Sequence, residues 1–280
     1  MIRRALPGDE AALEAFLSRH SATSMFLRGN LAAHGLNAGD SPNATTYHLY
    51  PAEGAVRAVI GLTQAGMVLC QFGDVPEALP FLVPALSGRQ IVGLSGSAAQ
   101  IGWLIDALGL GDTDFRMNHV EPLFHLDLAR LPVGDERIRR PVAEDQPLIA
   151  AWLRTYLIET GLGLDGPSVE ERAARAVAAG LIRFLLEDGQ PVAMAAINAR
   201  AANTVQVGGV FVPPGTRGRG LGRRATRAVL AEARAEGATN AFLFSNNDAA
   251  SRAYRSIGFT QVGEYRIAFL STPQVLVEPE

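Results

Sequence analysis

The chain has 280 residues, of which 48% are hydrophobic and 19% charged, and its formal net charge at pH 7 is −3. This composition excludes a disordered protein, and the length allows two domains of ordinary size. No apolar run reaches the ~18–20 residues of a membrane helix, and the start MIRRALPGDE lacks the apolar core of a signal peptide, so we expect a cytoplasmic protein that does not bind membranes.

The residue inventory excludes several classes of site. The chain has no lysine, so it cannot form a pyridoxal Schiff base, and it contains no HExxH, CxxC or GxSxG motif. We therefore expect no metal site. The one cysteine, Cys70, lies in the apolar run MVLC and is predicted to be a buried, inert thiol. An isoelectric point near 6.0 and arginines without interleaved aromatic residues argue against nucleic-acid binding.

The first half of the chain alternates strand and helix patterns. Periodicity predicts strands near 2–5, 45–51, 55–63, 66–73, 90–94 and 121–128, and helices near 9–20, 24–35, 76–86 and 98–108. A linker rich in proline, glycine and charge follows at LPVGDER, residues 131–137.

A weak internal repeat then begins. Residues 2–17, IRRALPGDEAALEAFL, align without gaps with residues 138–153, IRRPVAEDQPLIAAWL, and each segment is typical of a short strand, a turn and an amphipathic helix. The repeat and the linker predict two domains, at residues 1–132 and 133–280.

The second half shows a similar alternation of strand and helix patterns. Its pattern predicts strands near 137–142, 181–187, 191–199, 204–212 and 239–245, helices near 146–160, 168–179, 219–236 and 248–257, and a final pair of strands. A tight turn is expected at Asp188-Gly189, and Gly237 is expected to end the third of these helices.

The most informative segment is TVQVGGVFVPPGTRGRGLG, residues 204–222. A β-branched strand ends at two prolines, and a loop rich in arginine and glycine leads into a helix. Glycines let backbone N–H groups approach an anion at the helix N-terminus, where the helix dipole favours negative charge. The segment therefore predicts a phosphate or pyrophosphate cradle. It fits neither GxxxxGK[ST] nor GxGxxG.

The loop does fit V-x-P-x-x-R-x-x-G-x-G, and a second motif follows at residues 241–259, AFLFSNNDAASRAYRSIGF. Here an apolar strand precedes N-x-x-A, a tyrosine seven residues after the asparagine, and Gly-Phe. Together the two motifs resemble those of the GCN5-related N-acetyltransferases (GNAT family), over roughly residues 137 to 270. The resemblance implies an α/β (α+β) protein with two tandem GNAT-like domains, each a mixed, mostly antiparallel sheet flanked by helices and splayed between its fourth and fifth strands.

The resemblance also implies acetyl-CoA as the cofactor and a set of residues that bind it. These are Val210, Phe211, Val212, Arg217, Gly218, Arg219, Gly220, Leu221, Gly222 and Asn247. In the first half, Asp74 and Glu77 fall where the family has its phosphate-binding arginine and glycine. We therefore expect a degenerate N-terminal copy that does not bind the cofactor.

Two residues are candidates for acid–base catalysis. Tyr254 matches the family's tyrosine that protonates the departing thiolate, although it could instead be a packing residue. Many family members carry a glutamate base on the fourth strand, where this chain has Thr204 and Gln206, and its histidines all precede residue 132. Glu159 is the candidate base, with a water chain as the alternative; the glutamate could also simply face solvent.

The resemblance implies an enzyme that transfers acetyl from acetyl-CoA to the amine of a small-molecule acceptor, directly within a ternary complex. Two alternatives stay open: an acetyltransferase acting on protein N-termini or lysines, and a non-catalytic acetyl-CoA sensor. The sequence does not distinguish a monomer from a homodimer, and it does not identify the acceptor.

Overall fold

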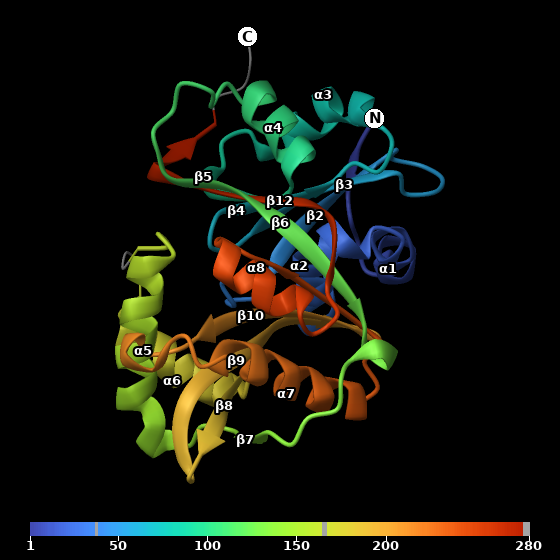
Figure 1. The fold of residues 1–280 in the computed structure, drawn as a ribbon. Helices are drawn as coiled ribbons and strands as arrows, with labels where there is room; N and C mark the ends of the chain where they lie inside the picture. The colour runs from blue at the N-terminus through green and yellow to red at the C-terminus, as the bar shows by residue number, and fades with distance from the viewer. Residues whose placement is uncertain (37–38, 164–166, 277–280) are drawn as a thin grey trace. The chain divides into compact units, whose positions relative to one another are not determined.

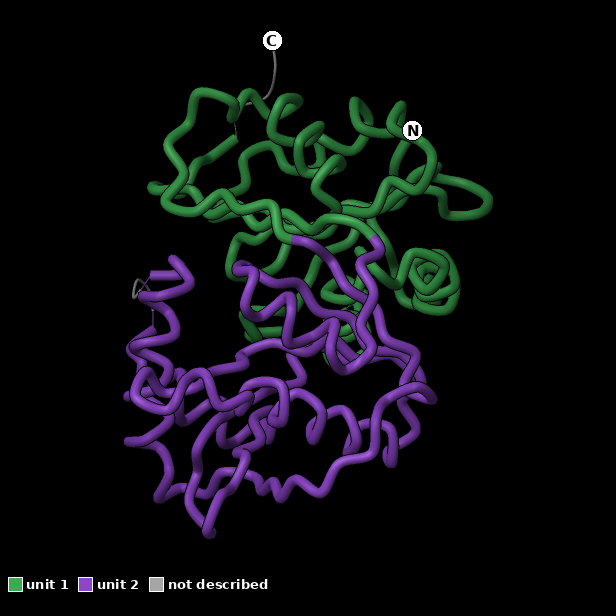
Figure 2. Tube along the Cα trace, in the orientation of Figure 1, with its two compact units in different colours: residues 1–121, 263–280 green, residues 122–262 purple. Residues whose placement is uncertain are grey.

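The computed structural model describes residues 1–36, 39–163 and 167–276, and its ribbon is drawn in Figure 1. The chain divides into two compact units, which Figure 2 colours separately. Unit 1 comprises Met1–Glu121 and Gly263–Glu280, and unit 2 comprises Pro122–Val262. No described helix is both long and apolar enough to span a lipid bilayer.

Unit 1 is a sheet with the order β1-β2-β3-β4-β5-β12, in which the only parallel pair among these described strands is β4–β5. Its strands are β1 (Arg3–Arg4), β2 (Thr45–Tyr50), β3 (Ala58–Thr63), β4 (Met67–Gln71), β5 (Gln90–Ser97) and most of β12 (Thr260–Val275). Its helical segments are α1 (Glu10–Ser18), α2 (Ser21–His34), η1 (Pro76–Ala78), α3 (Leu79–Leu82), η2 (Val83–Leu86) and α4 (Ala98–Ala107).

Unit 2 is a sheet with the order β6-β11-β10-β9-β8-β7, and β10–β11 is the parallel pair. Its strands are the end of β6 (Phe115–Asp127), β7 (Arg137–Arg139), β8 (Ile182–Glu187), β9 (Gln190–Ala201), β10 (Thr204–Phe211) and β11 (Asn240–Phe244). Its helical segments are η3 (Leu128–Arg130), η4 (Ala143–Asp145), α5 (Gln146–Glu159), α6 (Val169–Ala179), η5 (Pro214–Thr216), α7 (Leu221–Ala235) and α8 (Asp248–Arg255).

The two units repeat one another in element order and in strand pairing. The repeat extends to individual contacts at the start of each unit. Arg3 pairs with Asp9 at 2.5 Å, and Arg139 pairs with Asp145 at 2.6 Å. In both units the same aspartate also accepts a 2.8 Å hydrogen bond from the backbone N–H three residues before it. The repeated ion pair and turn account for the similarity of residues 2–17 and 138–153, because each fixes the entry into the first helix.

Each unit takes one strand from the other half of the sequence. In unit 2, residues 123–127 of β6 pair antiparallel with β11, and in unit 1, residues 265–275 of β12 pair antiparallel with β5. The compact units are thus separated at 121/122 and again at 262/263, whereas the sequence predicted a division at 132/133. The predicted final pair of strands is a single strand, β12.

Each sheet has an apolar core on both faces. In unit 2, α7 and α8 cover one face with a cluster that includes Val205 and Val207 of β10, and α5 and α6 cover the other with a cluster that includes Trp152 and Phe211. In unit 1, α1 and α2 cover one face, and α3 and α4 the other. Since strand side chains alternate between faces, neighbours along β10 contribute to different cores.

The helix predicted at residues 76–86 is not continuous in the structure. Residues 76–86 form three short segments, η1, α3 and η2, because proline stands at the start of each or one residue later. Two turn predictions are confirmed: Asp188 and Gly189 have φ of 50° and 78°, and Gly237 after α7 has φ of 97°. Cys70 is buried as predicted, and desolvation raises the pKa of its thiol.

Candidate active site

The site begins where β10 separates from β11. The parallel ladder between them extends only from Thr204 to Gln206, although β10 continues to Phe211 and β11 to Phe244. The pairing of β10 with β9 shifts register after Gln206 and again after Gly208. These irregularities bend β10 away from β11, as β-bulges do, and open the sheet.

The glycine pair in β10 belongs to this irregularity. A Cβ atom on Gly208 would collide with the side-chain amide of Asn198 on β9, and Gly209 has a positive φ of 57°. The backbone conformation at Gly209 favours glycine, and a side chain at Gly208 would have to displace the Asn198 amide. The register shift that follows Gly208 and the close approach of the Asn198 side chain thus both fall at this glycine pair.

The arginine–glycine loop follows β10 directly. Pro213 and Pro214 lead into η5, and Gly218 and Gly220 have φ of 81° and 73° before α7 begins at Leu221. Within the described ranges, no acceptor binds the backbone N–H groups of residues 218–223. A row of free N–H groups at the start of a 15-residue helix is a site for an anion, so the loop has the features of the predicted cradle.

Carboxylates hold the arginines of the loop. Arg217 donates to the carbonyl oxygen of Val212 at 2.9 Å and to the carboxylate of Glu159 at 2.7 Å, and its guanidinium lies over the ring of Phe211. The Arg217 and Glu159 side chains are 44% and 40% exposed, so a ligand can compete for this ion pair.

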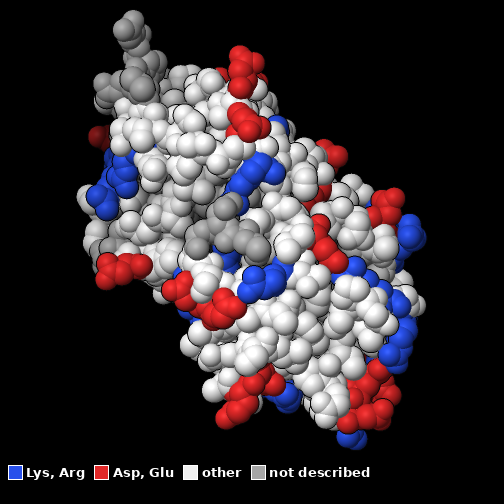
Figure 3. Space-filling view, turned by 90° about the vertical axis from the view of Figure 1, so that its left-hand side faces the viewer, with Lys and Arg blue, Asp and Glu red and all other residues white. Residues whose placement is uncertain are grey.

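A second carboxylate, Glu187 at the end of β8, binds two arginines. It accepts from Arg219 at 2.8 Å and from Arg224 at 2.5 Å. The hydrogen bond from Arg224 is the main cause of the lowered pKa of Glu187, and the charge of Arg219 lowers it further. On the face of the molecule that Figure 3 shows, acidic and basic side chains lie interspersed rather than in separate areas of one sign.

The predicted catalytic and cofactor residues of the second motif lie on and before α8. Asn247 is the N-cap of this helix, since its Oδ1 accepts from the N–H of Ala250 at 2.8 Å. Tyr254 is 7% exposed, and its ring packs edge-on against Phe259 at 6.1 Å. The asparagine thus positions the helix that carries the tyrosine. Both residues have packing or capping roles in addition to the roles that the sequence predicts.

Comparison with sequence families identifies this half of the chain. Residues 148–259 match the model of the Acetyltransferase (GNAT) family. These residues form a GNAT acetyltransferase domain. The match includes β10, the cradle and α8, so the family assignment rests on the elements that build the site.

Solved structures share the fold along nearly the whole chain. A GCN5-related N-acetyltransferase from Sphaerobacter thermophilus covers 100% of this chain with 96% of its own, at 14% identity and a TM-score of 0.58. A Drosophila protein covers 96% with 98% of its own, at 13% identity and a TM-score of 0.67. A GNAT acetyltransferase from Colwellia psychrerythraea covers 96% with 99%, at 14% identity and a TM-score of 0.54. No curated protein matches the sequence significantly.

The structure brings one histidine into unit 2 that the sequence placed in the first domain. His125 lies on β6 opposite Phe242 of β11, with ring centroids 4.8 Å apart, and its Nε2 is 2.8 Å from Oδ1 of Asn240. His125 precedes the linker and therefore falls in the predicted first domain. Only the pairing of β6 with β11 brings it into unit 2, and no local pattern in the sequence signals that pairing.

The structure also shows a buried amide side chain, that of Gln206, with one unpaired atom. Gln206 is 2% exposed, and its Nε2 donates to the carbonyl oxygen of Val207 at 2.7 Å. Its Oε1 is buried without a hydrogen-bond partner in the described structure. The sequence showed only that Gln206 is no base; the unpaired oxygen depends on the packing around it.

The corresponding place in unit 1 is closed by side chains of that unit. Beyond the parallel pair β4–β5, the N–H of Phe72 donates to Oε1 of Gln100 at 3.0 Å, and the N–H of Gly73 donates to Oε1 of Gln71 at 3.0 Å. The two glutamines bind one another at 3.0 Å, and Gln71 also donates to Thr23 at 2.6 Å. The backbone N–H groups that directly follow β4 are thus already bound by side chains of unit 1.

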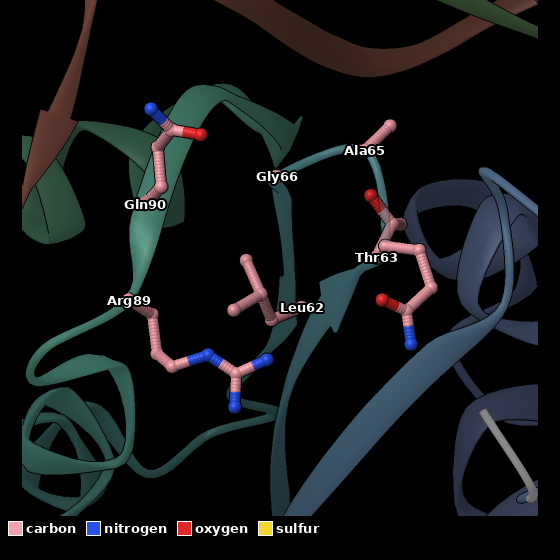
Figure 4. Close-up of a pocket in the computed structure, with 7 residues that line it drawn as sticks. Leu62, Thr63, Ala65, Gly66, Arg89 and Gln90 are labelled. Atoms are coloured by element: carbon pink, nitrogen blue, oxygen red, sulfur yellow. The ribbon is translucent and has the colours of Figure 1, made fainter. Parts of the chain in front are cut away.

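Two pockets lie away from the cradle. Figure 4 shows a polar one in unit 1, lined by the β3–β4 turn and by Arg89 and Gln90. The other lies between the start of α5 and Glu170 of α6. Neither shares a residue with the arginine–glycine loop. In the described part of the chain, no group of three histidine, cysteine, aspartate or glutamate residues is placed to hold a metal ion.

Proposed function

We propose that the chain is an N-acetyltransferase that transfers the acetyl group of acetyl-CoA to an amine of a small-molecule acceptor, directly within a ternary complex. The observation that carries the proposal is the cradle. Free N–H groups at the start of α7 lie at the end of a strand that has separated from its neighbour. The cradle fits a pyrophosphate, and the exposed edge of β10 fits an extended, amide-bearing arm.

Different residues of the chain would bind the cofactor, protonate the thiolate and remove the amine's proton. N–H groups of residues 218–223 and the Arg217 and Arg219 side chains would hold the phosphates, while residues 210–212 and Asn247 would hold the arm. A phenol is protonated at neutral pH because its pKa is ~10, so Tyr254 would give its proton to the departing thiolate. Glu159 would assist removal of the amine's proton, directly or through water.

The cradle is tested by calorimetric titration with acetyl-CoA. Gly220→Val should abolish binding, because a branched side chain would fill the space beside the free N–H groups and disfavour the φ of 73° at this position. Gly215→Val is the matched control in the same loop, since a Cβ there meets open space at an ordinary φ. Unchanged affinity in a folded Gly220→Val protein would remove the cradle from the proposal.

A small-molecule acceptor is supported by one structural relative. A region of a fungal multi-domain GH3 β-N-acetylglucosaminidase covers 96% of this chain at 11% identity with a TM-score of 0.54, and it is described as a glucosamine N-acetyltransferase. The shared fold can therefore serve the amine of a small molecule. Screening an amine panel beside N-terminal and lysine-containing peptides, with free thiol as the readout, tests the acceptor class. Transfer confined to peptides would favour a protein acetyltransferase.

A non-catalytic acetyl-CoA sensor is the second candidate, favoured by the absence of a carboxylate at Thr204 and Gln206 of β10. A sensor would bind acetyl-CoA in the titration and release no thiol with any acceptor.

We further propose that the N-terminal half is a degenerate copy of the GNAT domain. The repeated element order supports this, and so does the helix interrupted by prolines where the C-terminal half has α7.

A further inference from the structure

One buried polar atom of unit 2 lacks a partner at the point where the sheet opens. Gln206 is the last residue of β10 in register with β11, and it lies opposite Phe242. Its Oε1 is buried without a hydrogen bond in the described structure. An unsatisfied buried acceptor is costly, and in a native protein such an atom calls for an explanation, such as a catalytic role or a bound water, ion or ligand.

The orientation of this amide is fixed by its other end. Nε2 donates to the carbonyl oxygen of Val207 at 2.7 Å. If the amide were flipped, Oε1 of Gln206 would lie 2.7 Å from the carbonyl oxygen of Val207, and two acceptors at that distance repel one another. Oε1 must therefore be the unpaired atom. A ligand that satisfies it must therefore supply an N–H or O–H donor.

The side chain lies on the face of the sheet opposite α7. Val205 and Val207, its neighbours along β10, belong to the core beneath α7 and α8, and side chains alternate along a strand. Gln206 therefore lies on the face that α5 and α6 cover, off the edge along which an extended arm would pair with β10. From this face, a donor on the acceptor would reach Oε1 more directly than one on the cofactor's backbone-like arm.

We propose that Gln206 is a specificity-determining residue whose Oε1 accepts a hydrogen bond from the nitrogen of the acceptor, selecting primary over secondary amines. This inference rests on the proposed function.

The selection follows from the chemistry of a neutral amide. In the transfer a nitrogen–carbon bond forms and the carbon–sulfur bond breaks. One N–H proton leaves the nitrogen for Glu159 or water, and the thiolate takes up one proton from Tyr254. A carboxamide oxygen cannot take a proton near neutral pH, so the hydrogen that it binds must remain on the nitrogen. A primary amine keeps one N–H in the product amide. A secondary amine keeps none and would leave Oε1 unpaired again.

The test compares primary amines with their N-methyl analogues at saturating acetyl-CoA. Glucosamine, ethanolamine and 2-phenylethylamine serve as probes, and thiol release is the readout. Gln206→Met removes the acceptor at similar length, and it should raise KM for the primary amine and reduce the preference for it over its N-methyl analogue, each by about tenfold. The affinity for acetyl-CoA should stay unchanged, since Gln206 lies off the cofactor's edge.

Two further measurements separate this role from a structural one. Thr204→Val is the matched control on the same face of β10, because Thr204 is buried and its hydroxyl already donates to Asn203 at 3.3 Å. It should leave KM and the amine preference unchanged. Gln206→Met should change the Tm of the free protein little, because it removes an unsatisfied acceptor together with the donor to the carbonyl oxygen of Val207.

The remaining outcomes distinguish failure of the role of Gln206 from failure of the proposed function. Unaltered KM and amine preference in a folded Gln206→Met protein, with wild-type transfer intact, would overturn the role of Gln206 alone. A lowered Tm with unaltered preference would make Gln206 a packing residue. Acetyl-CoA binding by the wild type without transfer to any amine would overturn the proposed function, and this inference with it.

Discussion

At the scale of single residues, the contact between Glu159 and Arg217 gives the glutamate a second role. The sequence offered Glu159 as a base, and the structure pairs it with a cradle arginine at 2.7 Å. A carboxylate in that position competes with phosphates for Arg217 and repels them. The two roles can be told apart by different measurements. Loss of a base slows transfer, whereas loss of a competitor strengthens cofactor binding.

Glu159→Gln should strengthen acetyl-CoA binding by a few-fold, since an exposed ion pair is worth about 0–1 kcal/mol. Calorimetry checks this, with Glu170→Gln as the control. Glu170 is also in an exposed ion pair, with Arg154 at 3.1 Å, but away from the loop. Unaltered affinity together with a pH–rate profile that loses its acidic limb would instead identify Glu159 as the base.

Glu121 on β6 makes stability depend on pH. It is 7% exposed, and burial raises its pKa from 4.5 to about 7. An acid whose pKa is higher in the folded state favours folding when protonated. This contribution is complete below about pH 4.5 and is lost as the pH rises to about 7 and above.

Glu121→Gln should therefore raise the free energy of unfolding at pH 8 by about 1–3 kcal/mol and leave it nearly unchanged near pH 4. Urea denaturation at the two pH values measures the difference. Equal stabilisation at both pH values would point to packing rather than to ionisation of this group.

Tyr254→Phe should lower kcat by about 10²–10⁴-fold if the phenol is the general acid. Acetyl-CoA affinity should change by no more than a few-fold, because the ring and its edge-on contact with Phe259 are kept. A loss of turnover below about threefold would make Tyr254 a packing residue.

At the scale of elements, the sequence predicts regular segments well and their interruptions poorly. The strand at 204–212 and the helices at 146–160 and 168–179 agree closely with β10, α5 and α6, because apolar periodicity and caps determine them locally. The helix predicted at 76–86 is broken, since the apolar pattern outweighed its prolines in the prediction.

For the candidate site too, the sequence predicts what consecutive residues carry and misses what distant residues form together. Glycine and arginine spacing predicted the cradle, because that chemistry is carried by consecutive residues. The contact of Glu159 with Arg217, the position of His125 and the unpaired oxygen of Gln206 each depend on residues distant in sequence. A pattern of local spacing carries no information about such pairs.

At the scale of the whole molecule, the duplicated architecture raises the question of how many cofactors bind. Each chain should bind one acetyl-CoA. In unit 1, the N–H groups of Phe72 and Gly73 are already bound by glutamine side chains, and Glu77 lies in the turn that follows, within 4.0 Å of Arg57. Titration calorimetry gives the stoichiometry directly, and a value near two would overturn the assignment of unit 1 as a degenerate copy.

The crossing strands have a consequence for the history of the gene. Truncation at the linker before residue 133 would deprive β11 of residues 123–127 and leave its edge open, the kind of edge along which chains aggregate. On the proposal that the N-terminal half is a degenerate copy, neither half could be lost or moved by recombination without exposing such an edge in the other. A half that no longer binds a ligand would then be retained by selection on solubility, and its sequence could diverge as far as folding allows.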